Sequence, residues 1–258
     1  TVLASIMLAN NETGAVQPVR EMSRIARERG VLFHSDAVQA AGKMPLDVED
    51  LGVDLLSFSG HKFYGPKGVG ALYVRKGTPI APIVQGGHHE GGLRPGTVNV
   101  PGIVGMSKAL RLAVEELVEV SSRLREMRER LAAGIMRAVD GVRRNGGSER
   151  SLPNILNLSF EGADGEALLL GLDMMGVAVS TGSACTSDAV EPSHVLLAMG
   201  VDARLGVWSV NAVSPSRSRN PRARTPRSLV VITPSWSSGP RRLRGSRATA
   251  ANASGVLR

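Results

Sequence analysis

The order of apolar runs in the first 75 residues constrains the fold more than any other feature. Short apolar runs, which are typical of buried strands, cover residues 2–8, 31–33, 53–58 and 69–74. Between the first two runs, apolar residues recur at helical spacing from Val19 to Ala26, and Gly30 follows as a stop signal. Strands that alternate with helices predict an α/β fold with a mainly parallel sheet. Such sheets place ligands beyond the carboxyl ends of their strands, so polar residues there are site candidates.

The second half of the chain predicts a smaller α+β domain. A Gly- and Pro-rich region at 77–102 is predicted to be a loop, and a long helix with one apolar stripe follows it. The stripe consists of Leu124, Met127, Leu131, Ile135 and Val139. We further expect strands at 155–160 and 177–179, and helices at 166–172 and 193–199. This pattern divides the chain into a large domain over 1–118 and a small domain over 119–202.

The last 56 residues differ from the rest in composition and charge. The segment 203–258 is rich in Ser, Arg and Pro, and it holds eleven Arg but no Lys, Asp or Glu. Without it, 20 basic residues stand against 23 acidic ones, so the whole net charge of +8 resides in the tail. Such a composition buries too little apolar surface to offset its ordering entropy. We expect an unstructured tail, and binding of nucleic acid is the minority alternative because Lys and interleaved aromatic residues are lacking.

Composition excludes several classes of protein. The chain has 42% hydrophobic and 21% charged residues, which is typical of globular proteins, and no apolar run is long enough to span a membrane. Its N-terminus is apolar but lacks the basic leader of a signal peptide. A single cysteine forms no intramolecular disulfide, so we expect a reducing cytoplasm.

Two residues near strand ends indicate a carbonyl cofactor. Lys62 lies in the Gly-rich turn after the third run, and Asp36 follows the second run. A lysine forms a Schiff base when its amine faces a carbonyl cofactor, and pyridoxal phosphate needs a carboxylate at its ring nitrogen. A surface lysine and a helix-capping aspartate are the alternatives. A phosphate-binding loop is disfavoured because the pattern Gly-x-x-x-x-Gly-Lys-Ser/Thr is absent.

Five motifs together make the sequence similar to the cysteine desulfurases. These are fold-type I, pyridoxal-phosphate-dependent enzymes of the class V aminotransferase group. In chain order the motifs are Asn-Asn-Glu-Thr-Gly at 10–14, His-Ser-Asp-Ala-Val-Gln at 34–39, Ser-Phe-Ser-Gly-His-Lys at 57–62, the blocks at 86–90 and 94–97, and Ser-Thr-Gly-Ser-Ala-Cys-Thr-Ser at 180–187. The resemblance runs from Thr1 to about Asp202.

The resemblance implies a role for each of eight residues. Asp36 pairs with the pyridine nitrogen of pyridoxal phosphate, Asn11 and Gln39 contact its ring oxygen, and Lys62 holds it covalently. Ser59 and His61 bind its phosphate. Thr97 reaches the phosphate in the neighbouring subunit, which implies a homodimer. The eighth residue, Cys185, is the sulfur acceptor.

The implied reaction converts L-cysteine to L-alanine and leaves a persulfide on Cys185. The Ser-Ala-Cys-Thr-Ser form resembles the subgroup that serves iron–sulfur cluster assembly and tRNA thiolation, with a sulfur-acceptor protein such as an iron–sulfur scaffold as partner. Cys185 is also a candidate for a transient iron–sulfur ligand. The alternatives are a selenocysteine lyase, a small-amino-acid aminotransferase, or an inactive fragment of the family. A metal role for His88 and His89 is a minor alternative, because zinc needs three or four spaced ligands.

Two parts of the family pattern are missing. One is the first phosphate-binding turn with its ring-stacking histidine, and the other is a late arginine that binds the substrate carboxylate. The match stops near Ala203, where the composition changes. We therefore expect a chain truncated at its start, with a reading-frame change near Ala203. Resequencing tests this hypothesis, and one intact frame that includes the tail would contradict it.

Overall fold

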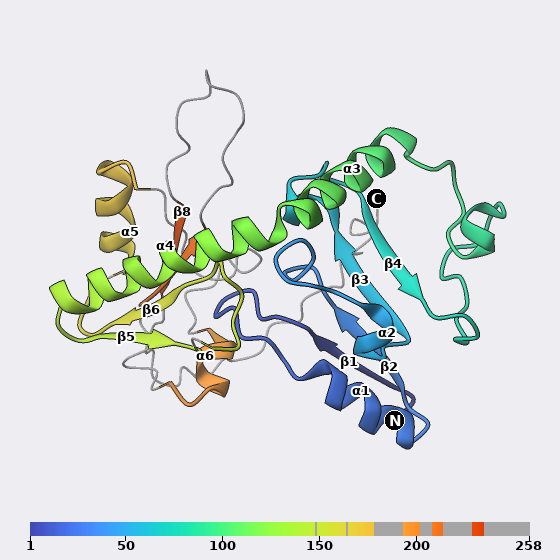
Figure 1. Ribbon diagram of the computed structural model, residues 1–258, viewed down its shortest axis with the longest axis horizontal. Coiled ribbons are helices and arrows are strands. Elements are labelled where there is room, and N and C mark those ends of the chain that lie inside the picture. Colours follow the sequence, from blue (N-terminus) through green and yellow to red (C-terminus); the bar gives the residue numbers. More distant parts are fainter. Residues whose placement is uncertain (148, 164, 178–192, 202–207, 214–228, 235–258) are drawn as a thin grey trace, which may run out of the picture.

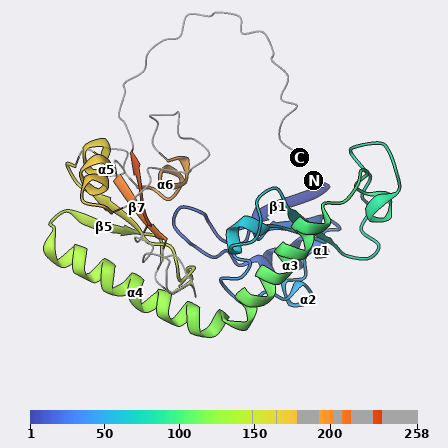
Figure 2. The same cartoon turned by 90° about the horizontal axis from the view of Figure 1, so that it is seen from above.

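A long helical rod joins two lobes of the molecule (Figure 1). The structure, a computed structural model, describes residues 1–147, 149–163, 165–177, 193–201, 208–213 and 229–234. The first lobe contains a four-stranded sheet, and the second contains two two-stranded sheets with two helices beside them (Figure 2). No helix within the described ranges is long and apolar enough to cross a bilayer.

The sheet of the first lobe has the strand order β1-β2-β3-β4. Its strands are β1 (Leu3–Met7), β2 (Leu32–Asp36), β3 (Leu55–Ser59) and β4 (Gly70–Val74). The first three are parallel, and β4 pairs antiparallel with β3 as an edge strand. The predicted strands are therefore all present. The second one extends through the polar residues to Asp36, because Ser35 is fully buried and its hydroxyl donates to the Ile6 carbonyl oxygen at 2.9 Å.

Helices α1 (Val19–Glu28) and α2 (Val48–Leu51) pack beside this sheet. The sequence predicted α1, whose buried residues Val19 and Ala26 join the core around Phe33. The helix ends before Gly30, which has φ of +65° and so suits the left-handed region that glycine tolerates. The core cluster fixes the three parallel strands, and thereby the edge at which their carboxyl ends meet.

The rod consists of α3 (Val100–Glu115) and α4 (Leu117–Ala138), with a break at Glu116. The predicted loop ends earlier than expected, at Asn99, and the sequence did not predict α3. Pro101 and Gly102 concealed its start, yet proline suits the first helical turn and the Asn99 side chain accepts a hydrogen bond from the Gly102 N–H at 3.0 Å. The predicted domain boundary at 118/119 falls inside α4. Of the expected apolar stripe, Leu124 is buried, whereas Met127 is 40% exposed.

The second lobe pairs β5 (Val142–Asn145) antiparallel with β6 (Asn157–Phe160). The prediction of a strand at 155–160 and a helix near 166–172 is confirmed by β6 and by α5 (Gly165–Met174). The predicted helix after Ser193 is α6 (His194–Ala198). β5 escaped prediction because Arg143 and Arg144 interrupt its apolar pattern. Of the expected strand at 177–179, Val177 is not in a strand and the other two residues lie outside the described ranges.

Two strands occur in the segment that was expected to lack regular structure. β7 (Trp208–Val213) pairs antiparallel with β8 (Leu229–Pro234), and β7 lies beside β6. The prediction of an unstructured tail is therefore wrong for these twelve residues. The apolar run that begins at Leu229 was visible in the sequence, but its pairing partner is far along the chain. The remainder of 203–258 lies outside the described residues.

Candidate functional site

The carboxyl ends of β1, β2 and β3 bring three of the predicted site residues to one edge of the sheet. Asp36 is the last residue of β2, Ser59 is the last residue of β3, and Asn11 follows β1 in the next turn. The register pairs Met7 with Asp36 and Asp36 with residue 57, so β2 lies between the other two strands. This edge is where open α/β sheets bind ligands.

A tight turn after β1 carries Asn11. The Asn10 side-chain oxygen accepts from the N–H groups of Glu12 at 2.9 Å and Thr13 at 2.8 Å, which makes an Asx turn. Gly14 closes the turn with φ of +74°, and a Cβ there would approach the Ile155 Cβ to 3.0 Å. Glycine is needed at this position, and the turn holds the half-buried Asn11 beyond the strand end.

The Asp36 carboxylate is oriented by its own backbone turn. Its Oδ1 accepts from the Val38 N–H at 2.8 Å, while the Ala37 N–H donates to the Ser57 carbonyl oxygen at 2.8 Å. These bonds continue the sheet for one residue and then turn the chain toward Gln39, which is half-buried. Asp36 itself is half-buried between the neighbouring strands, so its side chain can reach a group bound at the edge.

Ser59, His61 and Lys62 lie on the short helix η1 (Gly60–Phe63) and the residue before it. The Ser59 hydroxyl and the His61 Nδ1 are hydrogen-bonded at 2.8 Å. Phe63 anchors the helix in the core at 1% exposure, whereas His61 and Lys62 are exposed. The buried ring of Phe63 thus fixes the backbone of η1, which carries the exposed side chains of His61 and Lys62.

Lys43 is a nearby group that the sequence did not identify. Its Nζ lies 4.7 Å from the centroid of the Tyr64 ring, in a cation–π contact. Desolvation lowers the pKa of Lys43 below its usual 10.5, and the positive charge of Lys62 lowers it further. The two amines are therefore close enough to repel each other. No pattern singled out Lys43, which follows Gly42 in an ordinary-looking turn.

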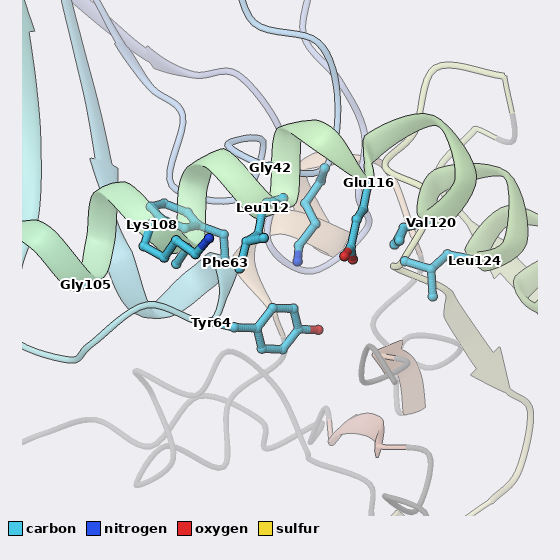
Figure 3. Close-up of a pocket in the computed structure, with 12 residues that line it drawn as sticks. Gly42, Phe63, Tyr64, Gly105, Lys108, Leu112, Glu116, Val120 and Leu124 are labelled. Carbon is cyan, nitrogen blue, oxygen red and sulfur yellow. The ribbon is translucent and has the colours of Figure 1, made fainter. Parts of the chain in front are cut away.

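A cavity of about 420 Å³ lies beneath the break between α3 and α4. Figure 3 shows Tyr64 and Glu116 facing this hollow from opposite elements, with Leu112 in its wall. Lys43 and Lys108 also line it. The cavity adjoins the helix that carries Lys62, since Phe63 and Tyr64 are among its lining residues.

Thr97 and the two adjacent histidines that the sequence singled out are not part of this cluster. Thr97 is exposed on the segment between β4 and α3, which projects away from the sheet beyond its edge strand and includes the short helix η2 (His89–Gly92). His88 and His89 are exposed on the same segment. Among the residues that the structure describes, no three His, Cys, Asp or Glu side chains converge on a metal position. Cys185 lies outside the described residues.

The residues at the sheet edge fit pyridoxal phosphate by their donor chemistry. A half-buried carboxylate suits a protonated ring nitrogen, and an amide at Asn11 suits the ring oxygen. The hydroxyl of Ser59 and the imidazole of His61 already point at one another, as two groups that share a phosphate would do. The exposed amine of Lys62 is the group that can condense with an aldehyde. The individual roles stay predictions.

Comparison with known proteins connects this geometry to a family. The sequence model of the family "aminotransferase class-V" matches residues 1–213, which extends eleven residues beyond the resemblance seen in the sequence. A cysteine desulfurase IscS from Dictyoglomus turgidum is 51% identical over 210 residues, which are 81% of this chain and 53% of that protein. The chain spans about half the length of the curated relatives it matches.

Solved structures agree with the sequence comparison. A NifS-like protein superposes with a TM-score of 0.75 at 46% identity, and the match covers 83% of this chain and 56% of that one. SspA, solved in complex with cysteine, superposes with a TM-score of 0.65 at 35% identity, over 80% of this chain and 56% of that one. The predicted fold, a fold-type I α/β transferase with a mainly parallel sheet, is confirmed. Proteins of this family depend on pyridoxal phosphate. By sequence and fold alike, the chain belongs to the aminotransferase class-V family.

Proposed function

We propose that the chain acts as a cysteine desulfurase, which converts L-cysteine to L-alanine and passes the sulfur on as a persulfide. The observation that carries the proposal is the placement of Asp36 at the end of β2 and of Lys62 in the short helix after the neighbouring β3, in a class-V fold. The similarity to curated cysteine desulfurases at about 50% identity supports it. The structural similarity to a protein solved with cysteine is consistent with the substrate.

Pyridoxal phosphate, when bound, supplies a carbonyl group for the substrate amine and a ring that takes up the electrons of a breaking bond. Lys62 would hold the cofactor covalently, and its amine would move protons at the substrate carbon. Asp36 would keep the proton on the ring nitrogen. Asn11 and Gln39 would hold the ring oxygen, and Ser59 with His61 would hold the phosphate.

Cys185 takes the sulfur in this proposal. Its thiolate attacks the sulfur of the substrate, so that a sulfur–sulfur bond forms while the carbon–sulfur bond breaks. The electron pair of the broken bond stays with the substrate, which leaves as alanine after it gains protons. The products are one L-alanine and one persulfide on Cys185, and no external oxidant is consumed.

The partners follow from this chemistry. A persulfide needs an acceptor, and we propose a sulfur-acceptor protein such as an iron–sulfur scaffold, with tRNA thiolation as the other use of the sulfur. During that transfer, Cys185 is also proposed as a transient thiolate ligand of the iron–sulfur cluster. Thr97, on the segment that projects beyond the sheet, supports a homodimer in which it reaches the partner's cofactor. A reducing cytoplasm suits the single thiol.

The experiment measures alanine and sulfide produced from L-cysteine by the purified chain with added pyridoxal phosphate and a thiol reductant. We expect both products in equal amounts, and we expect Cys185→Ala to abolish sulfide release while the absorbance of bound cofactor persists. Lys62→Ala should release neither product, and Lys67→Ala is its matched control, because this exposed lysine follows five residues later. Equal sulfide release from wild type and Cys185→Ala would contradict the role of the thiol.

A related activity on the same cofactor is the second candidate. A selenocysteine lyase or a small-amino-acid aminotransferase uses the same carboxylate and lysine but does not require Cys185. Two results together would favour this candidate. Cys185→Ala would turn over selenocysteine, or an amino acid together with a keto acid, and the wild type would release no sulfide from L-cysteine.

A further inference from the structure

The cavity of about 420 Å³ beneath the break between α3 and α4 has walls from three parts of the chain. The turn at Gly42 and Lys43 forms one wall, and the end of η1 forms the second with Phe63 and Tyr64. The third wall is one face of the rod, because residues four apart share a helix face. Figure 3 shows this face as a series in chain order: Lys108, Leu112, Glu116, Val120 and Leu124. The volume lies within the range of pockets that hold small ligands.

Close packing holds the three walls apart. Gly42 has φ of +70°, and a Cβ there would lie 2.9 Å from the Ala113 Cβ and 3.1 Å from the Phe63 Cβ. Only glycine fits where the turn approaches α3 so closely. The Ser121 hydroxyl of α4 donates to the Lys43 carbonyl oxygen at 3.1 Å. The turn is therefore fixed against both helices of the rod, and the cavity is formed before any ligand binds.

The lining carries a surplus of positive charge. Of the described residues that line the cavity, Lys43 and Lys108 are cationic and Glu116 is anionic. Neither lysine forms an ion pair with any residue in the described part of the chain. Desolvation lowers the pKa of Lys43, and the charge of Lys62 lowers it further. An anion beside Lys43 would compensate for the lost water and for this repulsion.

Apolar side chains beside these charges remain accessible. Leu112 is 37% exposed and the ring of Tyr64 is largely exposed, although both line the cavity. Val120 is half-buried and Leu124 is buried, so the wall becomes more enclosed along α4. A ligand with an apolar body would remove this surface from water, which is favourable.

We propose that the cavity is a binding site for a small amphipathic anion. Its carboxylate would lie beside Lys43, and its aliphatic body would lie along Leu112 and Val120. Charge selects the anionic end and the apolar wall selects the body. The proposal is independent of the cysteine desulfurase activity, because it uses none of the residues assigned to the cofactor or to sulfur transfer.

The test titrates octanoate into the full chain by isothermal titration calorimetry, below the concentration at which octanoate forms micelles. We expect one saturable site, and we expect Lys43→Met to weaken the affinity roughly tenfold or more, because a charge-assisted contact is lost. Lys67→Met is the matched control, since this exposed lysine does not line the cavity, and it should bind as the wild type does. Octanol and octylammonium have the same chain without the negative charge and should bind more weakly than octanoate.

A second substitution tests the apolar wall on an exposed position, where folding is not at risk. Leu112→Glu places a like charge in the cavity and should weaken octanoate binding roughly tenfold or more. Val114→Glu is its control, because Val114 is exposed on the same helix and does not line the cavity. If Lys43→Met does not fold, this pair provides the comparison.

Amine acetylation with an N-hydroxysuccinimide ester, read by peptide mass spectrometry, locates the site. Saturating octanoate should slow acetylation of Lys43 severalfold and leave Lys67 unchanged, because the bound carboxylate blocks only the amine beside it. Three results would each overturn the proposal: no saturable binding of octanoate, equal affinity for octanol, or equal protection of both lysines. Unchanged affinity in both Lys43→Met and Leu112→Glu would overturn it as well.

Discussion

The sheet edge and the contact region between the two lobes use polar residues in opposite ways. At the edge, Asp36 is half-buried, and Lys62 and His61 are exposed. Between the lobes, Glu12 is 2% exposed and Asn157 is 1% exposed, and both are hydrogen-bonded to groups distant in sequence. The difference teaches that substitutions at the edge should change chemistry without changing the fold. Substitutions between the lobes should change stability or positioning without removing the cofactor's partners.

The buried polar region extends through the second lobe. The Asn145 side-chain amide donates to Asn157 at 2.7 Å and to Ser159 at 2.6 Å, and all three residues are buried. Arg128 of α4 donates to Ser151 at 2.8 Å and to the Leu152 carbonyl oxygen at 2.5 Å, at 4% exposure. Such a network specifies one arrangement of the hairpin against the rod, because each unsatisfied group would carry a cost.

The largest effect is expected at the edge, for Lys62→Ala. Sulfide release should fall by on the order of 10³-fold or more, because both the covalent attachment and the proton transfers are lost. The melting temperature should change little, because the side chain is exposed. Sulfide assays and calorimetry check the two halves of this prediction. A variant that retained covalently bound cofactor would show that the assignment of Lys62 is wrong.

The next effect is expected between the lobes, for Arg128→Met. Loss of the two buried hydrogen bonds should reduce the free energy of unfolding by about 2–3 kcal/mol, while affinity for pyridoxal phosphate changes little. Urea unfolding with a cofactor titration measures both. An exposed arginine of the same helix supplies the control, Arg125→Met, for which we expect a change within about 0.5 kcal/mol. If the two variants were equally stable, the buried network would not matter to the fold.

A smaller effect is expected for Glu129→Gln, at the half-exposed border of that network. Hydrogen bonds from Arg144 at 2.7 and 3.1 Å are the main cause that lowers the pKa of Glu129 below its usual 4.5. The stabilisation is therefore complete above pH 4.5 and is lost as the pH falls through the lowered value. We expect a loss of about 0.5–1 kcal/mol at neutral pH, after screening by water. Urea unfolding curves of the wild type and Glu129→Gln should differ at neutral pH. They should coincide at strongly acidic pH, where Glu129 is protonated in the wild type.

The smallest effect is expected for Lys43→Met, which adjoins the edge. Burial and the charge of Lys62 lower the pKa of Lys43, so the unfolded chain binds its proton more tightly than the folded chain does. The free energy of unfolding of the wild type should therefore rise as the pH goes from the lowered pKa to 10.5, and the variant should lack this rise. Unfolding measured in steps through the alkaline range checks it. A parallel pH dependence in both proteins would contradict it.

The sequence predicted the regions whose signal is local. The strands around Asp36 and Ser59, and helix α1 before Gly30, followed from apolar runs and one glycine. The signals that failed were those that depend on distant residues. β5 carries two arginines: Arg144 is ion-paired with Glu129 of α4, and Arg143 is exposed. The β7–β8 pairing joins segments that share no periodic pattern. The start of α3 was hidden by Pro101 and Gly102, which read as loop residues although both suit a first helical turn.

The same distinction holds within the site. Asp36 and Lys62 could be proposed from their positions after buried runs, whereas Lys43, Glu12 and Ser193 could not. Their significance lies in burial and in contacts with residues far along the chain, such as the bond between Glu12 and Ser193, which are 181 positions apart. No periodicity in one sequence encodes such pairs.

The most direct test of the central claim is a map of the lysine that pyridoxal phosphate modifies. The chain has five lysines, so borohydride reduction at a one-to-one ratio of cofactor to protein, followed by peptide mass spectrometry, identifies the attachment site. We expect the label on Lys62, and we expect it to decrease strongly in Asp36→Asn, which lacks the charge that pairs with the ring nitrogen. A label spread evenly over the five lysines, or concentrated on Lys43, would contradict the assignment of the cofactor to this edge of the sheet.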